Sequence, residues 1–137
     1  MNDFALWLRP AEVSAAASAG LLLLRILIGC SLLTHGLPKI RNFAAVAPNF
    51  PTAFGLPRSV SLVGAIIGEV FLNILVIVGL CGQIAAALVA LQFLVIFFVI
   101  HAGTPFAKRE LGWLYLAAYL TLAVTGPGAC SLDAVLF

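Results

Sequence analysis

Four long apolar segments constrain this chain more than any other feature of its sequence. They cover approximately residues 19–40, 59–80, 82–101 and 110–126, and each is long enough for an α-helix to cross a hydrocarbon core about 30 Å thick. Only 9% of the residues are charged, which is too few to cover a water-facing surface. Backbone groups in lipid must be satisfied within their own segment, so the segments should be helices. The sequence predicts an all-α membrane protein, a four-transmembrane-helix bundle with a single domain over residues 1–137.

Basic residues are distributed unequally between the two ends of the predicted helices. Five of them lie at the loops 41–58 and 102–109, whereas the opposite side has only Arg9. Lysine and arginine favour the cytoplasmic side of a membrane, so we expect both loops to be cytoplasmic and both termini to lie outside. The net charge of +2 therefore reflects topology, and no basic stripe with interleaved aromatic residues predicts a nucleic-acid partner. The five residues are Lys39, Arg41, Arg58, Lys108 and Arg109.

Two charged residues lie inside the predicted helices and away from their ends, where hydrocarbon is the expected solvent. Arg25 is in the first helix and Glu69 is near the middle of the second. A charge at mid-bilayer costs about 2.5–3.5 kcal/mol even on a lenient scale, so two such costs are expected only where the groups meet. We therefore predict an internal Arg25–Glu69 ion pair. Asn73 lies one turn beyond Glu69 on the same face and is expected to hydrogen-bond to the pair.

The segment after the fourth predicted helix reads GPGACSLDAVLF. Pro127 cannot continue a helix and the flanking glycines allow a reversal, so we expect the tail to fold back and place Asp133 near the outer helix ends. Asp133, Arg25, Glu69 and Asn73 would then form one buried polar network. Two interpretations stay open: a clamp that fixes helix packing, or a site for a polar head group or a proton.

Histidines and cysteines supply the other candidate functional groups. His35 and His101 lie near the cytoplasmic ends of the first and third predicted helices. Such a pair suits a haem, a metal or a quinone carbonyl; the alternative is two interfacial histidines satisfied by water or a loop carbonyl. No third protein ligand lies nearby, so a metal site is not predicted. Cys81 and Cys130 both fall on the predicted outer side, where disulfides persist, and form a candidate disulfide.

The ordered set of these features resembles the DoxX family from about Gly20 to Asp133. The features are four short spans, the start LLLLRILIGCSLLTHGLPK, Glu69 after GLPRSVSLVGAIIG, Glu110 opening the fourth span, and the ending GPGACSLD. This chain has Cys130 where the family commonly has an aromatic residue before Ser-Leu-Asp. The resemblance implies a four-helix bundle in a bacterial inner membrane. It also implies a small subunit of a membrane oxidoreductase, including quinone-linked thiosulfate oxidation, or a partner in redox-stress complexes.

Two functions follow from the residues and the resemblance together. The first is a subunit or partner of a quinone-linked membrane oxidoreductase, with no covalently bound cofactor implied and quinone as the candidate ligand. Any electron-transfer centre is then expected in a partner or in the quinone itself, and whether the chain is an enzyme stays open. The second is a non-catalytic anchor or assembly factor that packs against a larger complex through small-residue faces. Both imply contact with the lipid bilayer and with other membrane subunits or a second copy. The candidate quinone or ligand contacts are His35, Lys39, His101 and Glu110.

Overall fold

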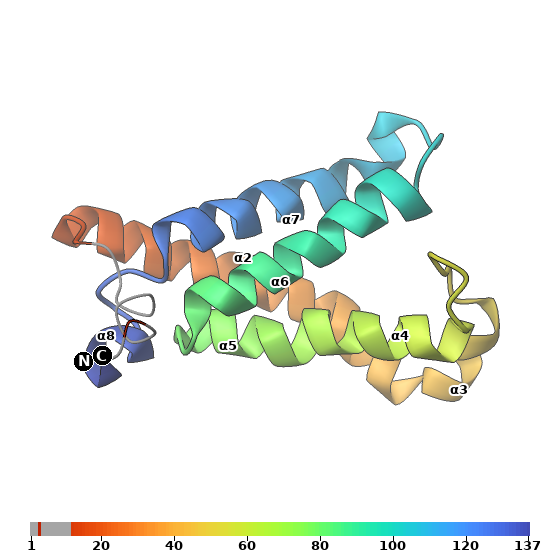
Figure 1. Ribbon diagram of the computed structural model, residues 1–137, viewed down its shortest axis with the longest axis horizontal. Helices are drawn as coiled ribbons and strands as arrows, with labels where there is room; N and C mark the ends of the chain where they lie inside the picture. The colour runs from red at the N-terminus through yellow and green to blue at the C-terminus, as the bar shows by residue number, and fades with distance from the viewer. Residues whose placement is uncertain (1–2, 4–11) are drawn as a thin grey trace.

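The computed structural model describes residue 3 and residues 12–137, and every regular element in this part of the chain is helical (Figure 1). Three of its helices are long and apolar enough to cross a membrane, so the all-α prediction is confirmed and the chain is a multi-pass membrane protein. Arg9, used above for orientation, lies outside the described residues. The three helices are α2 (Ala15–Arg41), the continuous helix Arg58–Val78, and the continuous helix Gly82–Ile100.

The fourth expected span corresponds to α7 (Phe106–Thr125), which has 20 residues. Its first turn and a half contains Lys108, Arg109 and Glu110, which shortens its apolar part. Length and apolarity together therefore mark three spans in the described residues and not four. The observed ends of the four long helices differ from the expected ones by at most four residues.

Two of the long helices contain a π-helical segment. The second is made of α4 (Arg58–Ile66), η2 (Ile67–Leu72) and α5 (Asn73–Val78). The third is made of α6 (Gly82–Val95) and η3 (Ile96–Ile100). A π turn inserts one extra residue and re-aims the side chains around it, and such turns are frequent at functional sites.

Glycines set the register between α2 and the second helix, which runs antiparallel to it (Figure 1). A Cβ atom at Gly36 would lie 2.7 Å from Val70 and 3.0 Å from the Cβ of Glu69. A Cβ atom at Gly29 would lie 2.3 Å from Ile77. Only glycine allows the two helix backbones to come this close, so Gly36 is fixed level with Glu69 and Gly29 level with Ile77.

The main core lies where α6 and α7 pack side by side, with α2 and α5 against them (Figure 1). Ala86, Val89 and Tyr119 are fully buried there. A smaller core on α4 holds the loop helices α3 (Phe43–Val46) and η1 (Ala47–Asn49). The hairpin of α6 and α7 diverges from α4 toward the end where α3 lies, whereas α4 itself packs on α2 and η1 (Figure 1).

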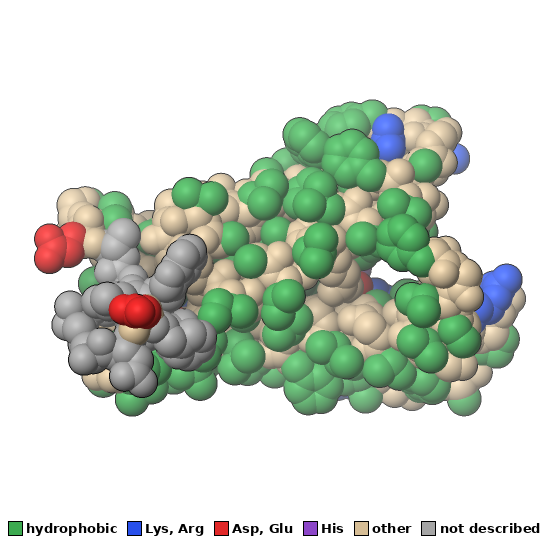
Figure 2. Space-filling view, in the orientation of Figure 1, with side chains coloured by type: hydrophobic (Ala, Val, Ile, Leu, Met, Phe, Trp, Pro, Cys, Tyr) green, Lys and Arg blue, Asp and Glu red, His purple; other side chains and the backbone are tan. Residues whose placement is uncertain are grey.

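The surface matches a lipid-exposed bundle. Hydrophobic side chains cover the flank of the molecule, and basic side chains gather at the end that carries the loops 41–58 and 102–109 (Figure 2). At the opposite end the short helix α8 (Leu132–Leu136) folds back beside the turn between α5 and α6. Its Asp133 N–H donates a hydrogen bond of 2.9 Å to the carbonyl of Gly79.

Candidate functional site

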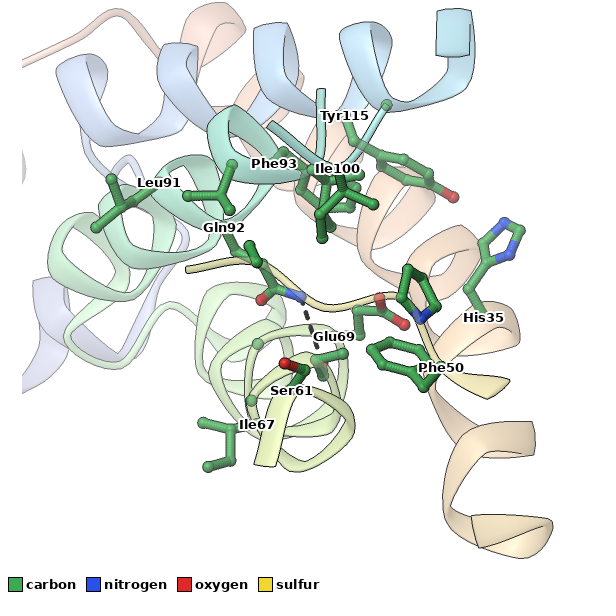
Figure 3. A pocket seen from close by; sticks show the side chains of 18 of the residues that line it. His35, Phe50, Ser61, Ile67, Glu69, Leu91, Gln92, Phe93, Ile100 and Tyr115 are labelled. Atoms are coloured by element: carbon green, nitrogen blue, oxygen red, sulfur yellow. Dashed lines mark hydrogen bonds between the residues drawn. The ribbon is translucent and has the colours of Figure 1, made fainter. Parts of the chain in front are cut away.

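A cavity of about 720 Å³ lies between the second helix and the hairpin of α6 and α7, with α2 as its third wall (Figure 3). Both π-helical segments border it, through Ile67, Gly68, Glu69 and Leu72 of η2 and Ile96 and Ile100 of η3. The segment from Phe50 to Leu56 forms part of its wall at the basic end of the bundle. The lining is largely apolar, and the polar or charged side chains in it belong to His35, Lys39, Ser61, Glu69, Gln92, His101 and Tyr115.

The strongest polar feature of the cavity is an ion pair between Lys39 and Glu69. The Nζ atom of Lys39 lies 2.5 Å from Oε2 of Glu69 and donates to both carboxylate oxygens. The side chain of Glu69 is 5% exposed and that of Lys39 is 22% exposed. The ammonium group also lies 5.8 Å from the ring centre of Phe50, within the range of a cation–π contact.

The predicted Arg25–Glu69 ion pair is wrong, because Glu69 is paired with Lys39. Gly36 is level with Glu69, and Arg25 is eleven residues before Gly36, about 16 Å along the helix axis. That separation exceeds the reach of an arginine side chain. Lys39 is three residues beyond Gly36 on the same helix face, and its side chain can reach back to the carboxylate.

Asn73 is fully buried and links three helices. Its amide nitrogen donates to the carbonyl of Gly29 at 2.8 Å and to that of Glu69 at 3.2 Å. Its amide oxygen accepts from the hydroxyl group of Tyr119 at 2.6 Å. Asn73 therefore contacts the backbone of Glu69 and not its carboxylate, and it fixes helix packing beside the cavity.

Asp133 and Arg25 belong to a second polar cluster at the other end of the bundle. Asp133 accepts hydrogen bonds from the backbone N–H groups of Cys81 and Gly82 at 2.7 and 2.8 Å. Arg25 is 1% exposed and donates to the backbone carbonyl of Cys130. Within the described residues its Nε and Nη1 atoms have no hydrogen-bond partner. The tail folds back as predicted, but the polar residues form two separate clusters and not one network.

The candidate disulfide is not formed, because Cys81 and Cys130 are both free thiols in the structure. Cys81 is half-buried at the start of α6, whereas Cys130 is exposed. Both residues contribute backbone groups to the cluster of Arg25 and Asp133. Their contribution to the fold is therefore made by the main chain.

The candidate ligand contacts divide into three that line the cavity and one that does not. His35, Lys39 and His101 all line it. The ring of His35 lies edge-on to that of Tyr115 at 6.0 Å. The Nδ1 atom of His101 lies 3.0 Å from the carbonyl oxygen of Ile96, so a backbone carbonyl satisfies this ring. Glu110 is exposed at the start of α7 and lies outside the lining.

Sequence reasoning did not identify Gln92 or Tyr115 as site residues. Gln92 crosses from α6 to α4, with its amide nitrogen 3.5 Å from the carbonyl of Ala65, and its amide oxygen fills the space above Gly68. The hydroxyl group of Tyr115 lies 2.7 Å from that of Ser31. A polar amide inside the third apolar segment was the signal for Gln92; nothing in the sequence distinguished Tyr115 from a core residue.

The arrangement suits a ligand with a small polar head and an apolar body. Lys39 offers a donor, Glu69 an acceptor, and the remaining lining offers apolar contact. Among residue 3 and residues 12–137, no three His, Cys, Asp or Glu side chains come together as metal ligands.

Comparison with known proteins agrees with the residues quoted above. The family model for DoxX matches residues 20–102, which include most of α2 and all of the second and third helices; Glu110 and the GPGACSLD ending lie beyond the matched residues. An uncharacterized protein of Haemophilus influenzae is 32% identical over 117 residues, which cover 80% of this chain and 85% of the relative. No solved structure matches. The resemblance inferred from the sequence is confirmed, and the chain belongs to the DoxX family.

Proposed function

We propose that this DoxX-family protein binds an isoprenoid quinone in its cavity and serves a membrane oxidoreductase as a quinone-binding subunit or partner. The observation that carries the proposal is the Lys39–Glu69 ion pair, which lies in the wall of a largely apolar cavity. A volume of about 720 Å³ falls in the range of small-molecule and cofactor sites, which span roughly 300–1,000 Å³.

The depth of the ion pair favours a neutral head group over a charged one. Glu69 lies ten residues before the Gly79 turn and eleven after the start of the second helix, about 15 Å from either end of that helix. Lys39 reaches it from the last turn of α2. A charged phospholipid head group would pay a large desolvation cost to reach that depth. A quinone head group is uncharged and carries two carbonyl acceptors, so it enters the cavity at a lower desolvation cost than a charged head group.

The ion pair matches both redox forms of such a head group. The ammonium of Lys39 is a donor for a quinone carbonyl, and the carboxylate of Glu69 is an acceptor for a hydroquinone hydroxyl group. His35 at the same cavity supplies a third hydrogen-bonding group. In this proposal the chain binds and orients the quinone, and the partner oxidoreductase exchanges electrons with it.

The proposed topology has four spans in a bacterial inner membrane, with α7 as the fourth and both termini outside. Its 20 residues are enough to cross the hydrocarbon core, and its charged first turns then lie at the cytoplasmic interface. The basic residues at one end of the bundle (Figure 2) support a cytoplasmic position for the loops 41–58 and 102–109.

The test is gentle purification from native membranes, followed by identification of bound quinones and co-purifying proteins. We expect the wild-type protein to retain quinone in near-stoichiometric amount together with an oxidoreductase subunit. The double variant Lys39→Met with Glu69→Gln removes both charges and should lose most of the quinone. Glu110→Gln changes an exposed carboxylate outside the cavity and should behave as wild type.

Two results would reject the proposal. Recovery of the protein with bulk phospholipid alone would show that it does not bind quinone. Recovery with a protein partner but without quinone would favour the anchor or assembly function instead.

A further inference from the structure

We infer that the cavity opens sideways into the hydrocarbon, between α4–η2 and α6, and that its ligand is a chain-bearing lipid whose tail remains in the bilayer. This inference rests on the proposed binding function and adds the route of entry and the need for a chain. Val60 and Ile67 on one side of this gap, and Leu88 and Leu91 on the other, line the cavity and are also 45–56% exposed. Side chains that both line a cavity and face outward form its rim.

The direction of the opening follows from the orientation of the helices. Figures 1 and 2 are drawn in one view, in which the long helices run across the page. In that view a gap is visible in the flank toward the basic end of the bundle, with charged side chains at its edge and hydrophobic side chains around it (Figure 2). The flank of a transmembrane bundle faces lipid, so an opening there admits molecules from the bilayer.

Gln92 lies between the ion pair and part of the outward-facing apolar rim. Figure 3 shows Ile67 and Leu91 on one side of this residue, and Glu69 and His35 on the other, together with the apolar side chains of Phe50, Phe93 and Ile100. A head group at the Lys39–Glu69 ion pair therefore leaves its tail along the apolar rim. This geometry fits a lipid with a compact head and a hydrocarbon chain better than a water-soluble solute.

The α4–η2 side of the gap has unusually small side chains. Ser61, Gly64, Ala65 and Gly68 lie on one helix face, at the spacing i, i+3, i+4, i+7. A Cβ atom at Gly68 would collide with Gln92, whereas one at Gly64 would meet no heavy atom within 4 Å. Glycine inside a helix costs about 1 kcal/mol relative to alanine, and no contact with residue 3 or residues 12–137 requires it at Gly64. Gly64 also lines the cavity, so the missing side chain leaves room there for a ligand chain.

Photolabelling in vesicles tests lateral entry directly. The protein is reconstituted in phosphatidylcholine vesicles that contain a long-chain alcohol with a diazirine on its chain, whose head group is uncharged, and the labelled residues are identified by mass spectrometry after irradiation. Phe93 and Tyr115 line the cavity but are only 5% and 2% exposed, so they are labelled only if a chain enters. Leu23 and Val124 are exposed on the outside and report contact with bulk lipid.

Gly64→Leu places a side chain in the proposed entrance, and Gly20→Leu is the matched control. A Cβ atom at Gly20 also meets nothing within 4 Å, and Gly20 does not line the cavity. We expect labelling of Phe93 and Tyr115 in the wild type and in Gly20→Leu, and a decrease of about tenfold or more in Gly64→Leu, since filling an apolar site excludes a ligand by such factors. Labelling of Leu23 and Val124 should be unchanged in all three.

Two results would overturn lateral entry. In one, the wild type is labelled only on outward-facing residues. In the other, Gly64→Leu is labelled on Phe93 and Tyr115 as strongly as wild type.

A competition experiment separates this inference from the proposed function. A benzoquinone with a decyl chain should suppress labelling of Phe93 and Tyr115, and the same ring without a chain should suppress it much less. If labelling depends on Gly64 but neither compound competes, lateral entry holds and quinone binding fails. If the chainless ring competes as well as the decyl compound, quinone binding holds and the need for a chain fails.

Discussion

Asp133 accepts a hydrogen bond from the backbone N–H of Gly82 at 2.8 Å, so the last helix of the structure caps the first turn of α6. The same carboxylate accepts a second bond from the N–H of Cys81. The first N–H groups of a helix have no partner within the helix, and they form the positive end of its dipole. A carboxylate at this position satisfies them and is favoured by their charge.

Loss of this carboxylate should destabilise the whole bundle. We expect Asp133→Ala to lower the free energy of unfolding by about 2 kcal/mol, since the hydrogen bonds and the dipole interaction are lost together. Asp133→Asn should have a smaller effect, because the amide oxygen still accepts one bond. Thermal unfolding in detergent measures both variants, with Glu110→Ala as the exposed control. Equal stability of Asp133→Ala and the control would show that the cap contributes nothing.

Two glycines should respond to alanine in opposite ways. Gly79 has φ of +75°, and its added Cβ would lie 2.2 Å from Nη1 of Arg25. Gly79→Ala should therefore cost more than about 2 kcal/mol through backbone strain and collision together. Gly64→Ala adds a methyl group in open space within a helix and should be neutral or stabilise by up to about 1 kcal/mol. The unfolding temperatures of the two variants decide this; a stable Gly79→Ala would contradict the packing of Arg25 on this turn.

The Lys39–Glu69 ion pair should show strong coupling in a double-mutant cycle. Lys39→Met leaves the carboxylate of Glu69 buried without its partner, which should cost about 3 kcal/mol or more. The double variant with Glu69→Gln removes the unpaired charge and should be more stable than Lys39→Met alone. Four unfolding measurements give the coupling energy. Additive effects of the two substitutions would show that the groups do not interact.

Cys130 provides a test of orientation. It is exposed beside α8, at the end of the bundle opposite the basic loops. In the proposed topology a membrane-impermeant maleimide should label it from outside in intact spheroplasts, and Cys130→Ser should abolish that label. Cys30 is exposed in the middle of α2, where lipid shields it from a charged reagent. Labelling of Cys130 only after the membrane is broken would show that this end of the bundle faces the cytoplasm, opposite to the proposed orientation.

The sequence was sufficient to locate the helices because apolar length alone determines where a chain can cross a bilayer. The back-folded tail was also foreseen, since Pro127 and its flanking glycines end α7. The ion-pair partner of Glu69, which is Lys39, was not predicted from the sequence. Its identity depends on the register between two helices, which is set by the contacts of Gly29 and Gly36. Periodicity within one helix carries no information about that register.

The cavity was beyond sequence reasoning for a related reason. It exists because the hairpin of α6 and α7 diverges from α4, and divergence is a property of the assembled bundle. The spacing of Gly64 and Gly68, four residues apart, is typical of a face for close helix contact. In the structure only Gly68 meets a neighbouring side chain, and Gly64 faces the open space of the cavity.

The spacing of Gly29, Gly36 and Lys39 has a consequence for how this protein can evolve. The two glycines are two helical turns apart and pack α2 against the second helix. Lys39 follows Gly36 by three residues, a spacing that allows its ammonium group to reach the carboxylate of Glu69. Deleting or inserting one residue between Gly29 and Lys39 would rotate everything beyond it by about 100°, carrying Lys39 toward lipid. Outward-facing positions in this stretch, such as Cys30 and Leu37, can change identity freely. Members that retain the ion pair should therefore differ from one another here by substitution, and an alignment gap within residues 29–39 should mark a lineage that has lost it.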